Sequence, residues 1–330
     1  MKFEHLFEPI DLNGFLLRNR ITMSAMPTGF SCTKGYVTGK MVSYYARGAK
    51  GGASLIVVEG AAVEDRGRIY SLQLMASNDT YLSGLNELAE GIKKSGAFAV
   101  LQLQHGGRFA MGTNPVSASD VSFPCPCTRK DIVPVPMTEE DINVTITSFT
   151  NAAVLAKKAG FDMVEINGGY GHLLSQFLSP RTNKRSDKYG GSLERRMKLP
   201  LDIIELIKGS LGDSLPIGYQ LMADELLDGG FSLDEAKVFS GKLEEYGVQF
   251  CLNSKLLEIT KDKVIIEDDS GEKVALKADL VINASGFNPA NDFYNKAKDL
   301  VNEVYLIGDA KVPRNIHDAM HEGYQIGLDI

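Results

Sequence analysis

Short apolar segments alternate with amphipathic segments along residues 1–248 of this chain, and this alternation limits its fold more than any other feature. Most of the short segments are apolar at consecutive positions, which is typical of strands buried on both faces of a parallel sheet. Five strands are predicted, at residues 21–26, 55–58, 98–103, 163–166 and 217–221.

Helices are predicted between these strands and after the last of them, where apolar residues recur at helical spacing. They cover residues 82–94, 139–159, 193–211 and 233–246. Thr138, with Asp141 three residues later, predicts a capping-box start for the second of them. Strands and helices that alternate at this spacing form βα units with right-handed crossovers. The chain is therefore expected to be an α/β protein, and the long loop 106–136 is a place where a barrel of such units keeps functional residues.

The pattern changes after Lys255. Three short segments, 256–260, 264–267 and 273–276, are separated by polar residues and predict an antiparallel meander. Further apolar strands are predicted at 278–285 and 304–307, and a final helix at 316–328. We place the junction near 242–250 and predict two domains, residues 1–248 and residues 249–330.

Charge and cysteine content exclude several classes of function. The net charge is -7, which argues against nucleic acid as a partner. The four cysteines include a Cys125-Pro126-Cys127 pair that is too tight for a zinc knuckle, so no metal site is predicted. The chain shows no apolar leader region and no apolar run of membrane-span length. We expect a cytoplasmic protein with free thiols and no membrane partner.

Four blocks of sequence carry a family resemblance. They read LFEPIDLNGFLLRNRITMSAMPTG at 6–29, GGASLIVVEGAAV at 51–63, LQLQHGGR at 101–108, and DMVEINGGYGHLLSQFLSPRTNKRSDKYGGSLERR at 162–196. Together they resemble the old yellow enzyme family, in its branch of 2,4-dienoyl-CoA reductase, 2-enoate reductase and related NADH:flavin oxidoreductases. The resemblance implies an FMN-type TIM (β/α) barrel that is incomplete, because five βα units are found here and a full barrel has eight.

The C-terminal segments resemble another part of the same long enzymes, the end of their pyridine-nucleotide/FAD module. They are GVQFCLNSKLLEIT at 247–260, KADLVINASGFNP at 277–289 and VYLIGDAKVPRNIHDAMHEG at 304–323. The resemblance implies that Gly308 and Asp309 contact the ribityl chain of FAD. However, the sequence lacks the GxGxxG motif and the cysteine run of the 4Fe-4S cluster that the family uses. We therefore interpret the chain as the product of a large internal deletion, joined near KLEEYGV at 242–248.

The resemblance also places a flavin over the carboxyl ends of the strands. It implies that Ala25, Met26 and Pro27 lie along the ring, that Gly60 lets the backbone approach it, and that Gln102 pairs with its pyrimidine edge. Plain core packing is the alternative role for residues 25–27.

Three residues after the fourth predicted strand are the candidate catalytic group. The resemblance implies that Asn167 and Tyr170 hold a substrate carbonyl and that the proton donor stands at His172, where the family has tyrosine. Tyr170 is an alternative donor, and a loop role without chemistry is an alternative for His172. Gln220 stands where the family pattern has an arginine near the flavin, which implies weaker flavin binding or a lower reduction potential.

The predicted function is FMN-dependent NAD(P)H:flavin oxidoreductase activity, in which an activated C=C bond of a small enoate or enone is reduced. One alternative is an inactive deletion remnant that lacks flavin, and another is a flavin-free ligand-binding module. An incomplete barrel leaves a strand edge unpaired, which a homo-oligomer would cover.

Overall fold

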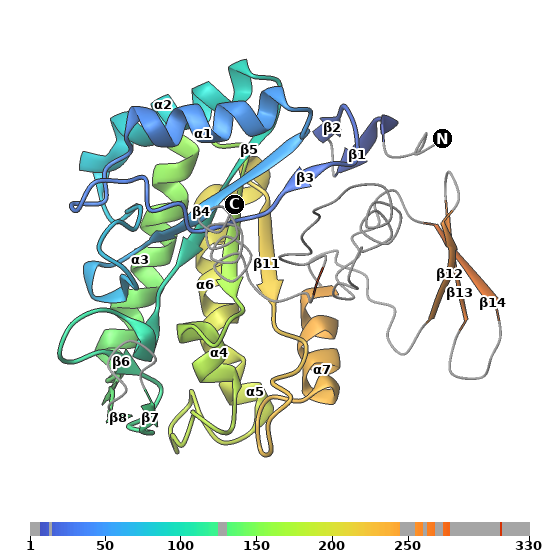
Figure 1. Cartoon of the computed structure of the whole chain (residues 1–330). Helices are drawn as coiled ribbons and strands as arrows, with labels where there is room; N and C mark the ends of the chain where they lie inside the picture. Colours follow the sequence, from blue (N-terminus) through green and yellow to red (C-terminus); the bar gives the residue numbers. More distant parts are fainter. Residues whose placement is uncertain are drawn as a thin grey trace, which may run out of the picture. The chain divides into compact units, whose positions relative to one another are not determined.

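Five parallel strands form one sheet in which spatial neighbours follow the order of the chain (Figure 1). The computed structural model describes residues 7–12, 15–124, 131–244, 255–259, 263–267, 273–277 and 311. The strands of the sheet are β3 (Thr22–Met23), β4 (Leu55–Ala62), β5 (Phe98–Gln104), β10 (Met163–Gly168) and β11 (Ile217–Leu221). This is the succession that right-handed βα units produce, and it confirms the predicted incomplete TIM-type barrel.

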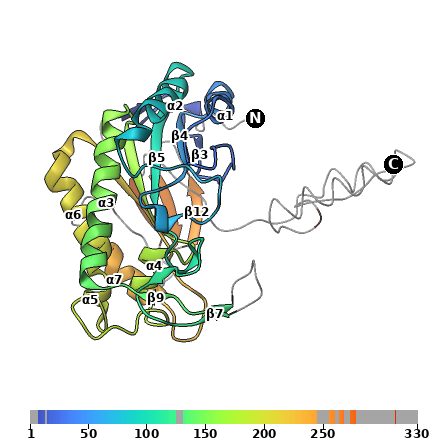
Figure 2. The same ribbon diagram turned by 90° about the vertical axis from the view of Figure 1, so that its left-hand side faces the viewer.

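Helices form a second layer outside the sheet. They are α1 (Gly39–Lys50), α2 (Leu82–Lys94), α3 (Glu139–Lys158), α6 (Lys198–Leu211) and α7 (Leu233–Glu244). Helix α1 packs against α2, α2 against α3, and α3 against α6, so each βα unit rests on the one before it. Figure 2 shows α3 and α6 side by side along the sheet. Within the described residues, the sheet has two edges, β3 and β11.

The strength of the local signals decides how well the predicted bounds agree with the structure. Helix α2 and strand β11 have the predicted bounds, and α3 begins with the predicted capping box. The predicted helix 193–211 is divided at Met197 into α5 (Leu193–Arg196) and α6. Helix α1 was not predicted, although Met41, Tyr45 and Ala49 form its buried face at a spacing of four.

Short elements fill the connections. Six of them are brief strands: β1 (Ile10–Leu12), β2 (Phe15–Leu17), β6 (Val116–Ser117), β7 (Phe123–Pro124), β8 (Asp131–Ile132) and β9 (Val135–Pro136). The others are α4 (Leu173–Leu178) and the 3₁₀ turns η2 (Asp65–Gly67), η3 (Asp79–Tyr81), η4 (Gly107–Phe109) and η5 (Gly212–Ser214). None of the helices in the described ranges has the length and hydrophobicity needed to cross a membrane.

The predicted antiparallel meander is confirmed. Strands β12 (Lys255–Ile259), β13 (Lys263–Glu267) and β14 (Lys273–Lys277) pair in sequence order. The chain divides into two compact units, Met1–Asp279 and Leu280–Ile330. The predicted domain boundary at 248/249 falls among residues 245–254, which lie outside the described residues, so that division stays a prediction. The elements predicted at 278–285, 304–307 and 316–328 also lie outside them.

Candidate active site

Four carboxamide side chains converge at the carboxyl end of the sheet. We call them the amide cluster: Gln102 and Gln104 on β5, Asn167 on β10 and Gln220 on β11. Register explains the convergence, because Gln102 pairs with Glu165 and Asn167 pairs with Gln220 across parallel strands. Alternate residues of a strand face the same side of a sheet, so all of these side chains share one face. The residues between them, such as Val164 and Ile166, are buried in the core.

Hydrogen bonds join the cluster into a chain. Nδ2 of Asn167 donates to Oε1 of Gln102 at 3.1 Å, and Nε2 of Gln102 donates to Oε1 of Gln220 at 3.1 Å. Nε2 of Gln102 also donates to Oε1 of Glu165 at 2.7 Å. At the other end, Nε2 of Gln220 donates to the hydroxyl oxygen of Tyr170 at 3.1 Å. The chain of bonds therefore runs from Glu165, through two glutamines, to Tyr170.

The two ends of this hydrogen-bond chain, Glu165 and Tyr170, differ in environment. Burial raises the pKa of the Glu165 carboxyl, and the hydrogen bond from Gln102 lowers it in part. Tyr170 is 68% exposed and has a φ of 57°, a left-handed conformation that is rare for a residue with a side chain. The cluster thus links a half-buried carboxyl group to an exposed phenol.

Asn167 has little capacity left for a ligand. Its Nδ2 contacts Oε1 of Gln102 and, at 3.5 Å, Oε1 of Gln104, while its Oδ1 accepts from the Gly169 amide at 3.1 Å. The side chain is 2% exposed. Asn167 therefore orders the cluster and the loop that leads to Tyr170.

His172 lies beside Tyr170, with 6.0 Å between the ring centroids, and precedes helix α4. Burial lowers the pKa of His172 to about 4, so the imidazole is neutral at pH 7. Its Nδ1 is buried and, in the described part of the chain, makes no hydrogen bond. A neutral imidazole is a poor proton donor, which favours the alternative donor, Tyr170.

The backbone of β4 reaches the cluster at Gly60. A Cβ atom at this position would lie 1.8 Å from Oε1 of Gln104 and 3.0 Å from Oε1 of Gln102. The Gly60 carbonyl accepts from Nε2 of Gln73 at 2.8 Å. A side chain here would displace the Gln104 amide, so the packing of the amide cluster favours glycine at this position.

The segment after β3 carries the other predicted cofactor residues. Met26 and Pro27 are exposed and Ala25 is half-buried, so these residues do not belong to the core. The next residue, Thr28, is hydrogen-bonded through its backbone amide to the buried carboxylate of Glu59 on β4. Residues 25–27 are thereby held at the carboxyl end of the sheet.

Sequence reasoning missed three polar residues of this region, Glu59, Gln104 and Glu165. Each interrupts an apolar strand, and an ionisable or amide side chain inside such a strand is a signal of a paired buried group. The predicted FAD contacts Gly308 and Asp309 lie outside the described residues.

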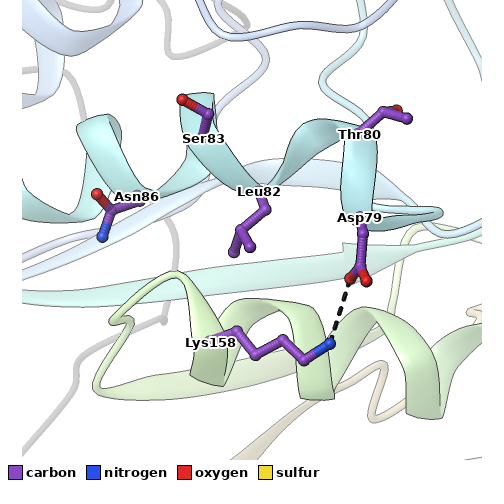
Figure 3. Close-up of a pocket in the computed structure, with 6 residues that line it drawn as sticks. All are labelled: Asp79, Thr80, Leu82, Ser83, Asn86 and Lys158. Carbon is purple, nitrogen blue, oxygen red and sulfur yellow. Dashed lines mark hydrogen bonds and ion pairs between the residues drawn. The ribbon is translucent and has the colours of Figure 1, made fainter.

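A cavity of about 420 Å³ opens elsewhere, in the helical layer near the start of α2 and the end of α3 (Figure 3). It is lined by Asp79, Thr80, Leu82, Ser83, Asn86 and Lys158. Nζ of Lys158 pairs with Asp79 at 3.3 Å. The lining of this cavity includes no member of the amide cluster.

The residues present fit one part of a flavin. Oε1 of Gln102 and the second Nε2 hydrogen of Gln220 offer an acceptor and a donor, which suit the polar edge of an isoalloxazine ring. The phosphate is different: in this fold it is held by loops after the later strands, and within the described residues the parallel sheet ends at β11. The site therefore matches the ring and supplies no phosphate-binding loop from that part of the sheet.

A parallel sheet with a helical outer layer and polar groups at its carboxyl end defines a (β/α)-barrel type of enzyme scaffold. The chain belongs to the NADH:flavin oxidoreductase / NADH oxidase family, whose model matches residues 5–277.

Named relatives agree with this assignment. An NADH oxidase of Thermoanaerobacter brockii is 40% identical over an alignment of 252 residues that covers 74% of this chain and 38% of that protein. An NADH:acrylate oxidoreductase of Vibrio harveyi is 36% identical over an alignment of 248 residues that covers 72% of this chain and 24% of that protein. The crystal structure of Old Yellow Enzyme from Pichia sp. has a TM-score of 0.67 and 28% identity, and 74% of this chain matches 68% of that one. The chain thus spans less than two fifths of these two curated relatives.

Proposed function

We propose that the chain binds FMN with its ring over the amide cluster and uses NAD(P)H to reduce the C=C bond of a small 2-enoate or enone. The observation that carries this proposal is the chain of hydrogen bonds from Glu165 to Tyr170, which presents amide groups and one phenol at the mouth of the sheet. The family assignment supports the flavin and the nicotinamide. The acrylate named for the relative from Vibrio harveyi supports the substrate class, because acrylate is a 2-enoate.

Residues of this chain would hold the substrate and supply a proton. The exposed hydroxyl of Tyr170 accepts a hydrogen bond from Gln220, so its own hydrogen is free for a substrate. Gln102 and Gln220 would hold the ring of FMN, and bound FMN would supply hydride chemistry, with NAD(P)H as the reductant and the β-carbon of the alkene as the acceptor. Tyr170 then gives its proton to the α-carbon, which completes a saturated C–C bond, and solvent restores the phenol. Asn167 keeps the loop of Tyr170 in place through the Gly169 amide.

Reconstitution tests the proposal. The purified chain is mixed with excess FMN, desalted, and examined for retained flavin absorbance, then supplied with NADH and acrylate. We expect retained flavin and formation of propionate. Tyr170→Phe should lower turnover at least about 100-fold, a usual contribution of a general acid, whereas His172→Phe should change it less. If the protein loses all flavin on desalting at every FMN concentration used, the proposal is wrong.

A second candidate function, an inactive remnant without flavin, is favoured by two observations. Gln220 lacks the positive charge of an arginine, and the described sheet ends at β11. A colourless protein after reconstitution supports it. The third alternative, a flavin-free binding module, predicts that enoates raise the melting temperature in the absence of FMN.

A further inference from the structure

Glu165 is the carboxyl group that is hydrogen-bonded to the amide cluster. It lies on β10, where burial raises the pKa of the carboxyl, and in the described part of the chain it makes no ion pair. Its contact is Nε2 of Gln102 at 2.7 Å, the shortest distance in the bond chain. A half-buried carboxyl with an amide as its partner requires a reason, since its partial burial costs desolvation energy.

The reason lies in the symmetry of carboxamides. The oxygen and nitrogen ends of a glutamine side chain have nearly the same shape, so its neighbours decide which end points where. An ionised carboxylate only accepts hydrogen bonds. Glu165 therefore favours the orientation in which Gln102 turns Nε2 toward it. Asn167, whose Oδ1 accepts from the Gly169 amide, favours the same orientation because its Nδ2 donates to Oε1 of Gln102 at 3.1 Å.

The orientation of the Gln102 side chain decides the orientation of the Gln220 side chain. Its second Nε2 hydrogen points to Oε1 of Gln220, which leaves Nε2 of Gln220 to face the hydroxyl oxygen of Tyr170. Because that oxygen accepts a hydrogen bond, the hydroxyl hydrogen of Tyr170 points elsewhere. With Gln220 reversed, its Oε1 would accept this hydrogen and withhold it from a substrate.

We propose that Glu165 is a positioning residue that, together with Asn167, fixes the direction of the hydrogen-bond chain Glu165–Gln102–Gln220–Tyr170 and so keeps the Tyr170 hydrogen free. The effect on turnover rests on the proposed function, whereas the direction of the hydrogen-bond chain does not. Glu165 acts through two glutamines and touches no substrate.

The first test needs no flavin. Nitrogen-15 NMR of the unaltered chain should show one set of side-chain N–H signals for Gln102 and Gln220. The set for Gln220 should shift when Tyr170→Phe removes its acceptor. Glu165→Gln, which has the same shape and no charge, should double or broaden both sets. The control Glu205→Gln, on the exposed face of α6, should leave them unchanged. A single unshifted set in Glu165→Gln overturns the proposal.

A charge swap sharpens the test. Glu165→Gln combined with Gln102→Glu keeps the composition and the charge, but the acceptor-only group now faces Gln220, which must turn Nε2 toward it. We expect the Gln220 signals to lose their response to Tyr170→Phe. If the swap restores the parental signals and their response, Glu165 acts through its charge alone and the proposal is wrong.

Turnover provides the second readout. With FMN bound, Glu165→Gln should lower kcat for the alkene about tenfold or more and leave KM nearly unchanged, because the proton donor is misdirected while binding persists. If Glu165→Gln doubles the NMR signals and leaves kcat unchanged, the hydrogen-bond chain has no role in turnover. Failure to bind FMN refutes the proposed function, and the NMR result still decides the direction.

Discussion

The carboxylate of Glu59 holds Thr28 by two hydrogen bonds, one from the backbone amide at 2.7 Å and one from the side-chain hydroxyl. Glu59 is fully buried, and the hydroxyl of Tyr70 also donates to it at 3.3 Å. Glu59 directly precedes Gly60 on β4, and Thr28 directly follows Pro27. This contact therefore joins the segment after β3 to the strand that approaches the amide cluster.

Replacement of Glu59 should release this segment. Glu59→Leu leaves the Thr28 amide without its acceptor at a buried site, so we expect a loss of about 1–3 kcal/mol in the free energy of unfolding. The amide of Thr28 should also exchange with solvent much faster. Thr28→Val is the matched control, because it removes the hydroxyl and keeps the amide bond to Glu59. Unchanged exchange at residue 28 in Glu59→Leu would show that the contact does not hold the segment.

Gly60 and Gly209 should respond to alanine in opposite directions. A Cβ at Gly60 collides with the buried Gln104, so Gly60→Ala should lower the free energy of unfolding by about 1–2 kcal/mol. Gly209 lies in α6 with open space around it, so Gly209→Ala should raise that free energy by up to about 1 kcal/mol through helix propensity. Urea unfolding measures both, and equal signs would contradict the steric argument.

Buried histidines should make the protein less stable in mild acid. Burial lowers the pKa of both His105 and His172 from 6.5 to about 4. Between these values, the unfolded chain binds protons that the folded chain does not. The free energy of unfolding should therefore fall as the pH falls from 6.5 to 4, by at most about 1.4 kcal/mol per pH unit for each histidine.

His172→Phe should remove one of these two contributions, so its curve of stability against pH should be shallower than that of the parent over the same range. Above pH 7.5, both histidines are neutral in the folded and in the unfolded chain. They should therefore not change the free energy of unfolding with pH in that range. Curves that stay parallel from pH 7 to pH 4 would mean that His172 is not held neutral.

The start of α3 provides a prediction at lower pH. Hydrogen bonds from Thr138 and then from Arg66 lower the pKa of Asp141 to about 2. Because the folded pKa lies below the ordinary 3.8, this contribution is complete above pH 3.8 and is lost as the pH falls through 2. Asp141→Asn should cost about 0.5–2 kcal/mol at pH 7, as other capping losses do. In unfolding experiments this difference should shrink toward pH 2, and a constant difference would exclude the charge as its source.

Local signals in the sequence predicted much of the fold. Helix α2 and strand β11 were predicted with their observed bounds, since each combines clear periodicity with clear ends. Helix α1 was missed because Gly39 and Gly48 obscure its apolar face. Strand β3 (Thr22–Met23) is shorter than the predicted strand 21–26. The chain after β3 leaves the sheet, and the Thr28 amide donates to the Glu59 carboxylate.

The candidate site was predicted only in part. Gln102, Asn167 and Gln220 were chosen by family resemblance, and the structure brings them together. Glu165 and Gln104 were not chosen, because their importance depends on which residues stand opposite each other in neighbouring strands. Register of this kind is set by the assembled sheet, and a single strand contains no record of it.

The left-handed backbone of Tyr170 has a consequence of its own. Glycines stand on both sides of it, and a third glycine would adopt the same φ of 57° without steric cost. The phenol therefore occupies a place where the main chain alone would favour having no side chain, at a cost of about 1 kcal/mol. A stability-guided redesign would replace this tyrosine early, and in doing so would remove the phenol at which the hydrogen-bond chain from Glu165 ends.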